Sequence, residues 1–420
     1  MKSYKYVIIG GGTTSGYAAE EFVEQGIGEG DLCIVSAESI LPMNRPPLSK
    51  GYLKDSHEDD EILINDQNFY DKNGIEVKLE TCARSVDLGR NEVDLDTGER
   101  IKFGKLLIAT GSSLNHLGVD GGNLQNVFYL RNINHSDKIR EQAKQSKNAV
   151  VVGGGYIGTE TAAGLTELGV KVSMVVPEDH LLAKFTEGEV ADFFKNLYKH
   201  QGIELIFNDK AVSFRGNGKV EEVELESGKR LPADMVVVGA GVKPNVKLFT
   251  GTALRINEAI QVNEYCETGV ENVYAAGDVV EFPDQIFNKK RHVEHWEHAF
   301  EQGKHAAKVM TGKREPYVFV PFFFSDVFDL SYEYFGDQEG ADFSATRGNV
   351  SDGNFSQWWF KDKICIAAFV MSSRPDEEGE KARTWIKEKV HIDQDRIDDE
   401  SVSLKSLELQ SQHHRNDPNH

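Results

Sequence analysis

Two glycine-rich stretches of the same design constrain the fold of this chain most strongly. They read "KYVIIGGGTTSGYAAEEF" from residue 5 and "AVVVGGGYIGTETAAGL" from residue 149. Each has the order of an apolar strand, a glycine turn and a helix. In such a unit the first glycine makes the tight turn, the second lets a pyrophosphate approach the backbone, and the third position must be small. The helix N-terminus adds unpaired N–H groups and a partial positive charge.

The spacing of the small residues fits that use in both copies. The first has Gly10 and Gly12, with Ser15 at the third small position, and the second has Gly153, Gly155 and Gly158. Either turn alone could be a glycine turn without a ligand. Two copies with the same following elements predict two dinucleotides, and a bound flavin with a nicotinamide donor is the economical pair.

An acidic residue closes the strand that follows each turn. Glu38 stands near the end of "DLCIVSAES" and Glu178 at the end of "KVSMVVPE". A carboxylate in this place accepts hydrogen bonds from a ribose. At Glu178 it suits a free 2′-hydroxyl and repels a 2′-phosphate, and Lys184 is the nearest cation. The sequence therefore favours NADH over NADPH.

Composition narrows the class of protein. The chain has 420 residues, enough for two or three domains, and no apolar run is long enough for a bilayer. A formal charge of −21 indicates a solvated acidic surface and disfavours nucleic acid and anionic membranes as partners. "MKSYKYVIIGGG" passes directly into a strand and has no signal-peptide pattern, so we expect a cytoplasmic protein.

The cysteines exclude one mechanism. Cys33, Cys82, Cys266 and Cys365 are far apart and form no C-x-x-C or C-x-x-x-x-C pair. We therefore expect no redox disulfide and no metal cluster, so electrons leave directly from the reduced flavin. His292, His295 and His298 are spaced three apart, but they wrap only partly round a helical face, and we predict no metal site there.

Three later strands end in small residues. "KFGKLLIATGSS" ends at Thr110 and Gly111, and "MVVVGAGVKPN" contains Gly241; both are expected where the chain crosses between domains. "ENVYAAGDVVEF" ends in Gly277 and Asp278. An acid beside a glycine at a strand end can reach a ribityl hydroxyl, although a plain turn would look the same.

In these motifs the chain resembles flavoproteins with two dinucleotide-binding domains. Within them it is similar to the branch of apoptosis-inducing factor, oxygenase-type ferredoxin reductases and monodehydroascorbate reductases. The matching motifs run in family order from residue 6 to about 337: "GGGTTSGYAAEEF", "PMNRPPLSKGYL", "LLIATGS", "FYLRNI", "VVVGGGYIGTE", "VGAGVKPN", "VYAAGDV", "RHVEHWEHA" and "FDLSYEYFGD".

The resemblance implies an α/β fold. It has a glutathione-reductase-like pair of Rossmann-type dinucleotide-binding domains and a C-terminal α+β domain. The expected order is a first FAD-binding part over 1–114, an NAD(H)-binding domain over 115–245, a second FAD-binding part over 246–316, a C-terminal domain over 317–406 and a disordered tail over 407–420.

The resemblance also assigns roles around the flavin. It places Lys50 beside flavin N5, paired with Glu160, and makes Tyr156 the ring that covers the flavin until the nicotinamide displaces it. Glu294 and His295 would face the nicotinamide. Without the resemblance, Lys50 would be read as a surface charge and Tyr156 as a packing residue.

A helix beginning near residue 294 or 295 would aim its N-terminus at flavin N1 and O2 and stabilise the negative charge of the reduced ring. Trp296 would offer backbone to the isoalloxazine. The other cofactor-binding residues predicted here come from the turns, the strand ends and the matching motifs. They are Gly11, Thr13, Thr14, Arg45, Ala83, Arg131, Gly154 and Ile157.

The electron acceptor is left open by the sequence. Phe300 and Phe324 stand where the resemblance to monodehydroascorbate reductases would place the arginine and tyrosine that hold the ascorbyl radical. The cluster Phe322, Phe323, Phe324 and Phe328 suits a quinone or other small apolar acceptor, and equally a core.

We therefore expect an FAD-dependent NAD(P)H oxidoreductase, as a monomer or homodimer. It would pass electrons to a small carrier, a ferredoxin- or rubredoxin-type protein or a quinone. The alternatives are a monodehydroascorbate reductase, an NADH-binding redox sensor like apoptosis-inducing factor, and a structural protein with vestigial nucleotide folds.

Overall fold

The computed structural model describes residues 1–54 and 59–409, which form two compact units. The first unit contains residues 1–181 and 198–318, and the second contains residues 182–197 together with the chain from residue 319 on. The expected tail lies outside the described residues from residue 410 on, as do residues 57 and 58 of the acidic stretch "HEDDEILIND".

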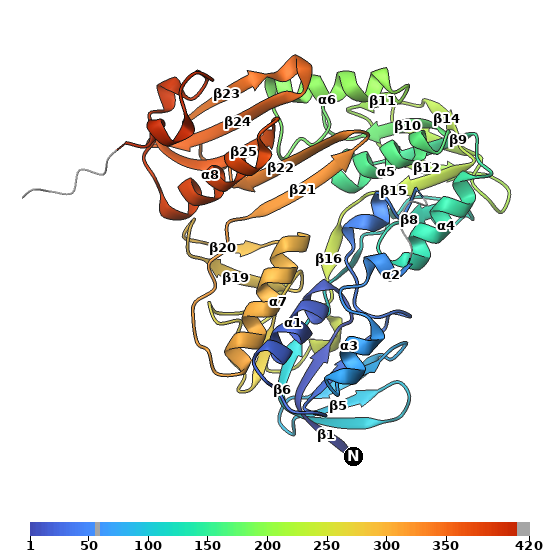
Figure 1. Ribbon diagram of the computed structural model, residues 1–420. Helices are drawn as coiled ribbons and strands as arrows, with labels where there is room; N and C mark the ends of the chain where they lie inside the picture. Colours follow the sequence, from blue (N-terminus) through green and yellow to red (C-terminus); the bar gives the residue numbers. More distant parts are fainter. Residues whose placement is uncertain (55–58, 410–420) are drawn as a thin grey trace, which may run out of the picture. The chain divides into compact units, whose positions relative to one another are not determined.

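The first unit begins with a mixed sheet of seven strands in the order β3-β2-β1-β6-β5-β4, with β18 added beside β6. Strands β3, β2, β1, β6 and β18 run parallel, whereas β5 and β4 form an antiparallel extension. Figure 1 shows strands β1, β5 and β6 of this sheet in blue and cyan near the N-terminus. The strands are β1 (Lys2–Ile9), β2 (Leu32–Val35), β3 (Glu76–Lys78), β4 (Ala83–Asp87), β5 (Glu92–Leu95), β6 (Arg100–Ile108) and β18 (Val273–Ala275).

The register of this sheet brings the predicted strand ends together. Ile9 pairs with Val35 on one side and with Ile108 on the other, and Ile108 pairs in turn with Ala275. The first glycine turn, Glu38, Thr110 and Asp278 therefore all follow strands at one edge of the sheet. Ligands of open parallel sheets bind at this carboxyl edge.

A second sheet in the same unit is wholly parallel, in the order β11-β10-β9-β15-β8. Val152 pairs with Val175 and Val238, so the second glycine turn and the segment leading to Glu178 leave the same edge. A three-stranded antiparallel sheet accompanies it. The strands are β8 (Val127–Tyr129), β9 (Asn148–Val152), β10 (Lys171–Val176), β11 (Glu204–Phe207), β12 (Ala211–Arg215), β13 (Glu222–Leu225), β14 (Arg230–Pro232) and β15 (Met235–Val238).

The chain passes from the first sheet to the second and back through a two-stranded antiparallel ribbon. It is made by β7 (Ser112–Leu114) and β16 (Val242–Pro244), with Ser112 opposite Pro244. The predicted crossing segments thus lie side by side. Thr110 Oγ1 donates to the carbonyl of Asn245 at 2.9 Å, and Asn245 Nδ2 donates back to the carbonyl of Thr110 at 2.9 Å.

The glycine turns are required by close backbone packing. Gly10 has φ +131°, and a Cβ there would lie 2.0 Å from the carbonyl oxygen of Ala109. Gly153 has φ +114°, and a Cβ would lie 2.5 Å from the carbonyl oxygen of Gly239. In both sheets the turn is therefore pressed against the neighbouring strand end, which only glycine permits.

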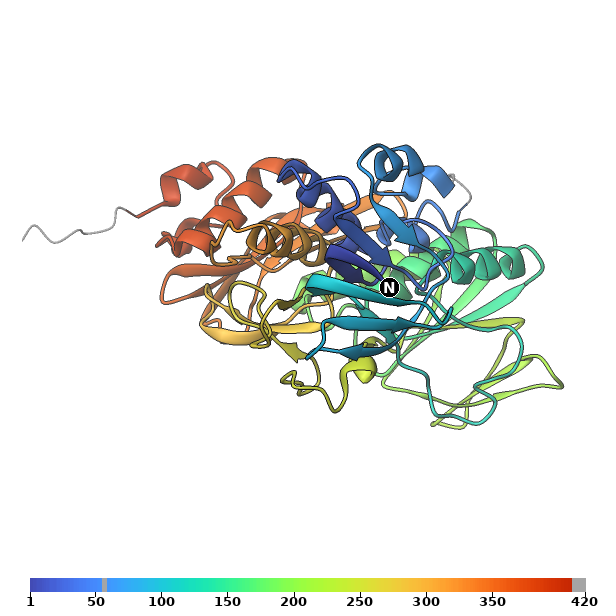
Figure 2. The same cartoon turned by 90° about the horizontal axis from the view of Figure 1, so that it is seen from below.

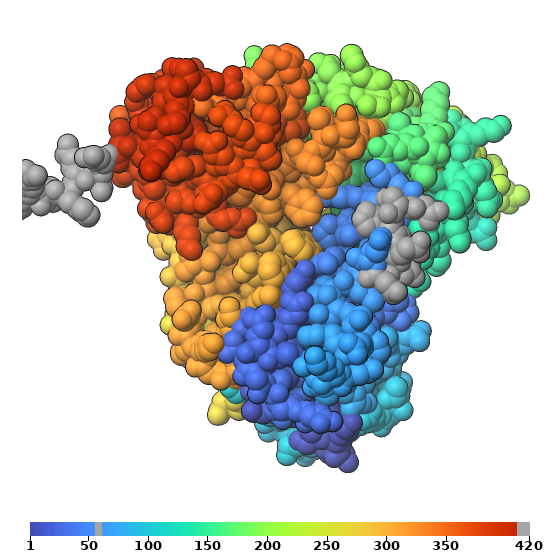
Figure 3. Space-filling view, viewed as in Figure 1, coloured from blue at the N-terminus to red at the C-terminus, as the bar shows by residue number. Residues whose placement is uncertain are grey.

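Helices α1 and α5 of the first unit begin at these edges, directly after the two glycine turns. Helix α1 packs along α7, as Figures 1 and 2 show, and their segments adjoin on the face seen in Figure 3. The helical segments are α1 (Thr13–Glu24), η1 (Pro46–Ser49), α2 (Asp59–Ile62), α3 (Gln67–Lys72), α4 (Ile133–Ala143), α5 (Tyr156–Glu167), η2 (Lys247–Phe249) and α7 (Trp296–Met310). A small sheet of β17 (Ile260–Gln261), β19 (Val280–Asp284) and β20 (Lys289–His292) precedes α7.

The second unit is an α+β structure built on one antiparallel sheet of five strands, in the order β21-β22-β25-β24-β23. Helix α8 (Pro375–Glu388) packs on the sheet, with Trp385 against Trp358 at 5.2 Å between ring centroids. The strands are β21 (Phe322–Val327), β22 (Leu330–Gly336), β23 (Phe343–Asn349), β24 (Asn354–Lys361) and β25 (Ile364–Met371). The short helices are η3 (Val350–Asp352), η4 (Gln394–Arg396) and η5 (Leu404–Leu407).

Residues 182–197 belong to this second unit, although the sequence assigns the range 115–245 to a nucleotide domain. They include most of α6 (Gly188–His200). Phe194 on this helix is buried against Tyr332 at 5.2 Å and Phe369 at 6.0 Å between ring centroids. The apolar face of the helix is thus covered by rings of the antiparallel sheet.

A buried arginine orders the end of the second unit. The guanidinium of Arg347 donates to the carbonyls of Ile397, Asp399 and Val402 at 3.0, 2.7 and 2.9 Å. Its Nε lies 3.8 Å from Oε1 of buried Glu378. Ordered contacts continue to Leu409, whose N–H donates to the carbonyl of His391, so the first residues of the expected tail belong to the folded unit.

The fold class predicted from the sequence is confirmed: two dinucleotide-binding sheets are joined to a C-terminal α+β unit. Within residues 1–54 and 59–409, no helix has the length and apolar character needed to span a bilayer.

Candidate functional site

The first glycine turn leaves the N-terminus of α1 open for an anion. Gly12 is the N-cap, and among the described residues no side chain caps this helix. A Cβ on Gly12 would meet only the guanidinium of Arg45, at 3.4 Å from Nη2. Free N–H groups, a helix dipole and an adjacent cation are the donors that a pyrophosphate requires.

The second turn is built in the same way. Gly155 is the N-cap of α5, no side chain within the described part of the chain caps it, and a Cβ there would meet nothing within 4 Å. Ile157 in the first turn of the helix is 38% exposed, unusual for a large apolar residue and consistent with an open surface in front of the turn.

Glu38 and two arginines follow the first turn. Arg45 Nη2 donates to Glu38 Oε1 at 2.8 Å, and Arg45 Nη1 donates to the carbonyl of Arg131 at 2.6 Å. Ala83 begins β4, three residues after Glu80, whose N–H donates to the carbonyl of Glu38. Glu38, Arg45 and Arg131 are therefore held near one another beside the turn.

Asp278 is the centre of a second group. It accepts from Ser112 Oγ at 2.7 Å and from Arg131 Nη2 at 3.1 Å. Burial alone would raise the pKa of Asp278, but Arg131 and the Ser112 hydroxyl outweigh it and hold that pKa below its usual range. Burial and neighbouring Arg45 lower the pKa of Arg131, which still stays protonated. The carboxylate is thus charged and can accept from a ligand hydroxyl.

Lys50 and Glu160 form an ion pair between the two halves of the unit. Lys50 Nζ lies 3.6 Å from Glu160 Oε1, and their side chains are 12% and 6% exposed. The hydroxyl of Ser49 donates to the other carboxylate oxygen, Oε2. Because Ser49 and Lys50 come from η1 and its end, while Glu160 comes from α5, the pair joins the flavin-side segment to the second glycine turn.

Tyr156 and His295 also link the two halves. Tyr156 is the first residue of α5, and His295 is the N-cap of α7. The Tyr156 hydroxyl lies 2.7 Å from His295 Nε2. Burial raises the pKa of Tyr156, and the carboxylates of Glu294, Glu160 and Asp278 act in the same direction, so the hydroxyl stays protonated.

Aromatic rings gather at the start of α7. The indole N–H of Trp296 donates to Oδ1 of Asn44 at 2.8 Å, and the Tyr17 hydroxyl donates to the same oxygen at 3.2 Å. Phe300 packs 4.3 Å from the Tyr17 ring and 5.7 Å from the Trp296 ring. Lys304 lies over the Phe300 ring, but its ammonium is already 3.4 Å from Glu20.

The remaining predicted residues lie as follows. Thr13 and Thr14 are buried in the first turn of α1, and Gly11 and Gly154 lie within the two turns. Gly111 and Gly241 flank the crossing ribbon, with φ +64° and +79°. A Cβ on Gly158 would lie 2.2 Å from the carbonyl oxygen of Gly153. Glu178 is exposed after β10, and the Glu294 carboxylate hydrogen-bonds to His292.

Several residues that shape the site were missed from the sequence. Ser49, Ser112 and Asn44 carry hydrogen bonds to predicted residues. Ser49 and Asn44 lie inside the quoted motif "PMNRPPLSKGYL", so the signal was present. Small polar side chains are too common for their partners to be read from one sequence.

The three spaced histidines have separate partners. His292 Nδ1 meets the carbonyl of Val280 at 2.9 Å, and His298 is fully buried beside Tyr317, whose hydroxyl lies 3.1 Å from Nδ1. Burial lowers the pKa of His298 to about 3. Among the described residues, all four cysteines are free, and burial raises the pKa of Cys33 to about 12.

Phe324 lies in the second unit, on β21. Phe322 and Phe323 of the same strand are buried, at 4.9 Å from the Phe335 ring and 4.3 Å from the Phe185 ring, whereas Phe324 and Phe328 are half-buried. Two members of the phenylalanine cluster are therefore core residues of this unit.

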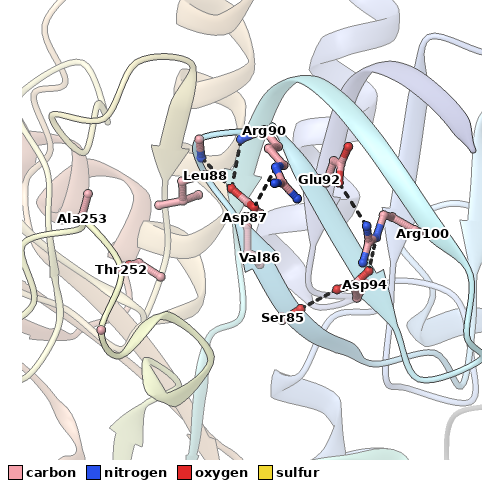
Figure 4. Close-up of a pocket in the computed structure, with 12 residues that line it drawn as sticks. Ser85, Val86, Asp87, Leu88, Arg90, Glu92, Asp94, Arg100, Thr252 and Ala253 are labelled. Atoms are coloured by element: carbon pink, nitrogen blue, oxygen red, sulfur yellow. Dashed lines mark hydrogen bonds and ion pairs between the residues drawn. The ribbon is translucent and has the colours of Figure 1, made fainter.

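A surface pocket of about 470 Å³ lies away from the glycine turns, between the β4–β5 hairpin and residues 251–253. Figure 4 shows that its charged side chains are turned toward one another. Arg100 pairs with Asp94 and Glu92, and Arg90 lies 3.8 Å from Asp87. Both arginines of this pocket are thus paired with carboxylates.

Comparison with known proteins identifies the family to which the chain belongs. A family model described as pyridine nucleotide-disulphide oxidoreductase matches residues 4–303, and a model described as reductase C-terminal matches residues 322–408. The chain therefore belongs to the pyridine nucleotide-disulphide oxidoreductase family.

Individual proteins are similar to this chain over almost its whole length. A monodehydroascorbate reductase of Pisum sativum is 37% identical over 432 residues, 97% of this chain and 99% of that protein. The putidaredoxin reductase in a covalent complex with putidaredoxin superposes with a TM-score of 0.91 at 27% identity, over 97% of this chain and 98% of that one. A ferredoxin reductase from Rhodopseudomonas palustris gives 0.90 at 28% identity, over 96% and 100%.

The chain is thus an FAD-dependent pyridine nucleotide oxidoreductase, as the sequence predicted. The residues present fit a flavin nucleotide and a nicotinamide nucleotide. Two uncapped helix N-termini meet two glycine turns with room in front of Gly12 and Gly155, and charged Asp278 and Arg131 stand beside the first.

The buried His298 predicts an acid-sensitive step in stability. With its pKa at about 3, the imidazole of His298 stays neutral in the folded chain under conditions where the unfolded chain, with the ordinary histidine pKa of 6.5, binds a proton. Between these values the unfolded state holds more protons, so the free energy of unfolding falls as the pH falls, by up to roughly 1.4 kcal/mol per pH unit. We expect His298→Gln to flatten this slope in urea unfolding between pH 6 and pH 4.

A matched change at the exposed His391 controls for loss of an imidazole. His391→Gln should keep the wild-type slope. Equal slopes for the wild type and His298→Gln would contradict the account of a buried neutral imidazole.

Proposed function

We propose that the chain takes hydride from NADH and passes the electrons from its FAD to a small electron carrier, a ferredoxin- or rubredoxin-type protein or a quinone. The observation that carries this proposal is the buried Lys50–Glu160 pair, which joins the flavin-side segment to the second glycine turn. When bound, FAD supplies the chemistry of accepting a hydride and releasing electrons to the acceptor.

The residues of the chain then bind and orient the two nucleotides and neutralise their charge. The N-terminus of α1 with Arg45 and Arg131 would hold the flavin pyrophosphate, and the charged Asp278 would accept from the ribityl chain. The N-terminus of α5 would hold the nicotinamide nucleotide, with Glu178 on its ribose. Asp278, Arg131 and Arg45 are linked by the contacts at 3.1 and 2.6 Å described above.

At the point of transfer, Lys50 and Glu160 would fix the nicotinamide amide as an ion pair. Loss of either would remove an ion pair that is largely shielded from water, which is costly. Tyr156 would cover the flavin and move aside for the nicotinamide. The N-terminus of α7, with Trp296 and neighbouring Glu294 and His295, would stabilise negative charge on the reduced ring.

Electrons would leave the flavin without a thiol relay. Cys33, Cys266 and Cys365 are buried, and burial raises the pKa of Cys33 to about 12, so that thiol is not a nucleophile at neutral pH. Free cysteines also suit the cytoplasmic location that we propose. We retain the domain limits given above as a proposal, with residues 182–197 and 407–409 assigned to the C-terminal domain, and a monomer or homodimer as the oligomeric state.

Monodehydroascorbate reduction is the second candidate, because the relative from Pisum sativum carries that name. Phe300 argues against it. This ring stands at the position expected to hold the radical anion, and the cation above it, Lys304, is already paired with Glu20. An ascorbyl anion would therefore find a neutral aromatic surface.

The acceptor is tested by anaerobic reduction of the yellow protein with NADH, followed by mixing with a ferredoxin, a rubredoxin, a quinone or ascorbyl radical. We expect rapid reoxidation by one carrier class, roughly 10-fold or more faster than by ascorbyl radical, since a lost charged hydrogen bond costs about that factor. Phe300→Arg should raise the rate with ascorbyl radical, with Phe300→Met as the matched control.

Faster reoxidation of the wild type by ascorbyl radical than by any carrier would favour the second candidate. A long-lived reduced complex that no acceptor discharges would instead indicate a redox sensor.

The preference for NADH is tested at Glu178. A carboxylate beside the ribose repels a 2′-phosphate, so we expect Glu178→Gln to lower the discrimination against NADPH in kcat/KM by roughly 10-fold. The neighbouring Asp179 offers a control with the same change of charge, because it is exposed and pairs with His180. Asp179→Asn should leave the ratio nearly unchanged, and an equal effect of both variants would contradict a specific role for Glu178.

A further inference from the structure

The hydrogen bond between Tyr156 and His295 spans the two nucleotide halves of the first unit. The Tyr156 hydroxyl and His295 Nε2 are 2.7 Å apart, and the rings meet edge to face, with centroids 5.8 Å apart and planes inclined by 71°. One residue begins α5 and the other precedes α7. The bond therefore ties the start of α5 to the start of α7.

We propose that His295 is a positioning residue that holds Tyr156 over the flavin through this hydrogen bond and thereby sets the affinity for the nicotinamide nucleotide. The inference rests on the proposed function, in which Tyr156 moves aside for the nicotinamide ring. Because the bond must break before the ring moves, it opposes nucleotide binding by its own free energy.

Local structure supports this use of the imidazole. His295 occupies the N-cap position of α7, yet within the described residues its side chain makes no capping hydrogen bond. Its Nε2 instead lies 2.7 Å from the Tyr156 hydroxyl. Burial raises the pKa of that hydroxyl, and the carboxylates of Glu294, Glu160 and Asp278 act in the same direction, so it stays protonated. A protonated hydroxyl can donate to Nε2 when the ring proton is on Nδ1.

The size of the effect follows from ordinary hydrogen-bond energetics. A neutral hydrogen bond in a partly buried place changes an equilibrium by roughly 2- to 10-fold. Removing the hydroxyl with Tyr156→Phe keeps the ring and should therefore tighten binding of NAD+ by that factor. The gain should vanish where His295 can no longer accept the bond.

The experiment is a double-mutant cycle on the oxidised holoenzyme, with the dissociation constant for NAD+ measured by isothermal titration calorimetry. His295→Asn removes the acceptor but keeps a favourable N-cap residue, and its shorter amide does not reach Tyr156. His295→Gln serves as the rescue variant, because its longer amide reaches the place of Nε2. Tyr198→Phe removes another hydroxyl bond to α5, from Tyr198 on α6 to the carbonyl of Thr159 at 3.0 Å.

Tyr156→Phe is expected to lower the dissociation constant roughly 2- to 10-fold in the wild-type and His295→Gln backgrounds and to change it little in the His295→Asn background. Tyr198→Phe should leave it unchanged. An equal effect of Tyr156→Phe in all three backgrounds, or none in the wild type, overturns the inference alone. Failure of the wild type to bind NAD+ at all overturns the proposed function and the inference with it.

Discussion

The contact between Lys50 and Glu160 is the interaction on which the arrangement of the first unit depends. It brings two opposite charges together where their side chains are 12% and 6% exposed, and the Ser49 hydroxyl satisfies the second carboxylate oxygen. A buried charge is tolerated only when it is paired and hydrogen-bonded. The pair therefore holds the segment between β2 and β3 against α5, the helix that follows the second glycine turn.

Much of this arrangement could be predicted because it follows from backbone requirements. Gly10 and Gly153 are needed where the chain turns against the carbonyl of a neighbouring strand, at φ +131° and +114°. Because only glycine fits such positions, they can be recognised in the sequence. The parallel register then brings Glu38, Thr110 and Asp278 to one sheet edge, so a list of strand ends becomes a site.

What the sequence did not predict depends on side-chain partners and on packing between distant segments. The sequence predicts that Glu38 binds a ribose, but in the structure its carboxylate accepts a hydrogen bond from Arg45 at 2.8 Å. The spacing of the motif residues does not reveal this alternative partner. The sequence places residues 182–197 within the nucleotide-binding domain, but Phe194 is buried by Tyr332 and Phe369 of the C-terminal sheet. Arg347 would be read as a surface residue, whereas it is 2% exposed and bonds the carbonyls of a loop some fifty positions later.

The central claim is that the two turns hold two nucleotides in one fixed geometry, so that hydride passes directly from one to the other. It is tested most directly by the rate of anaerobic flavin reduction by NADH deuterated at either of its two C4 positions. The account predicts a primary isotope effect with one stereoisomer only, because a fixed nicotinamide presents one face to the flavin. No isotope effect with either stereoisomer while the flavin is reduced, or equal effects with both, would contradict it.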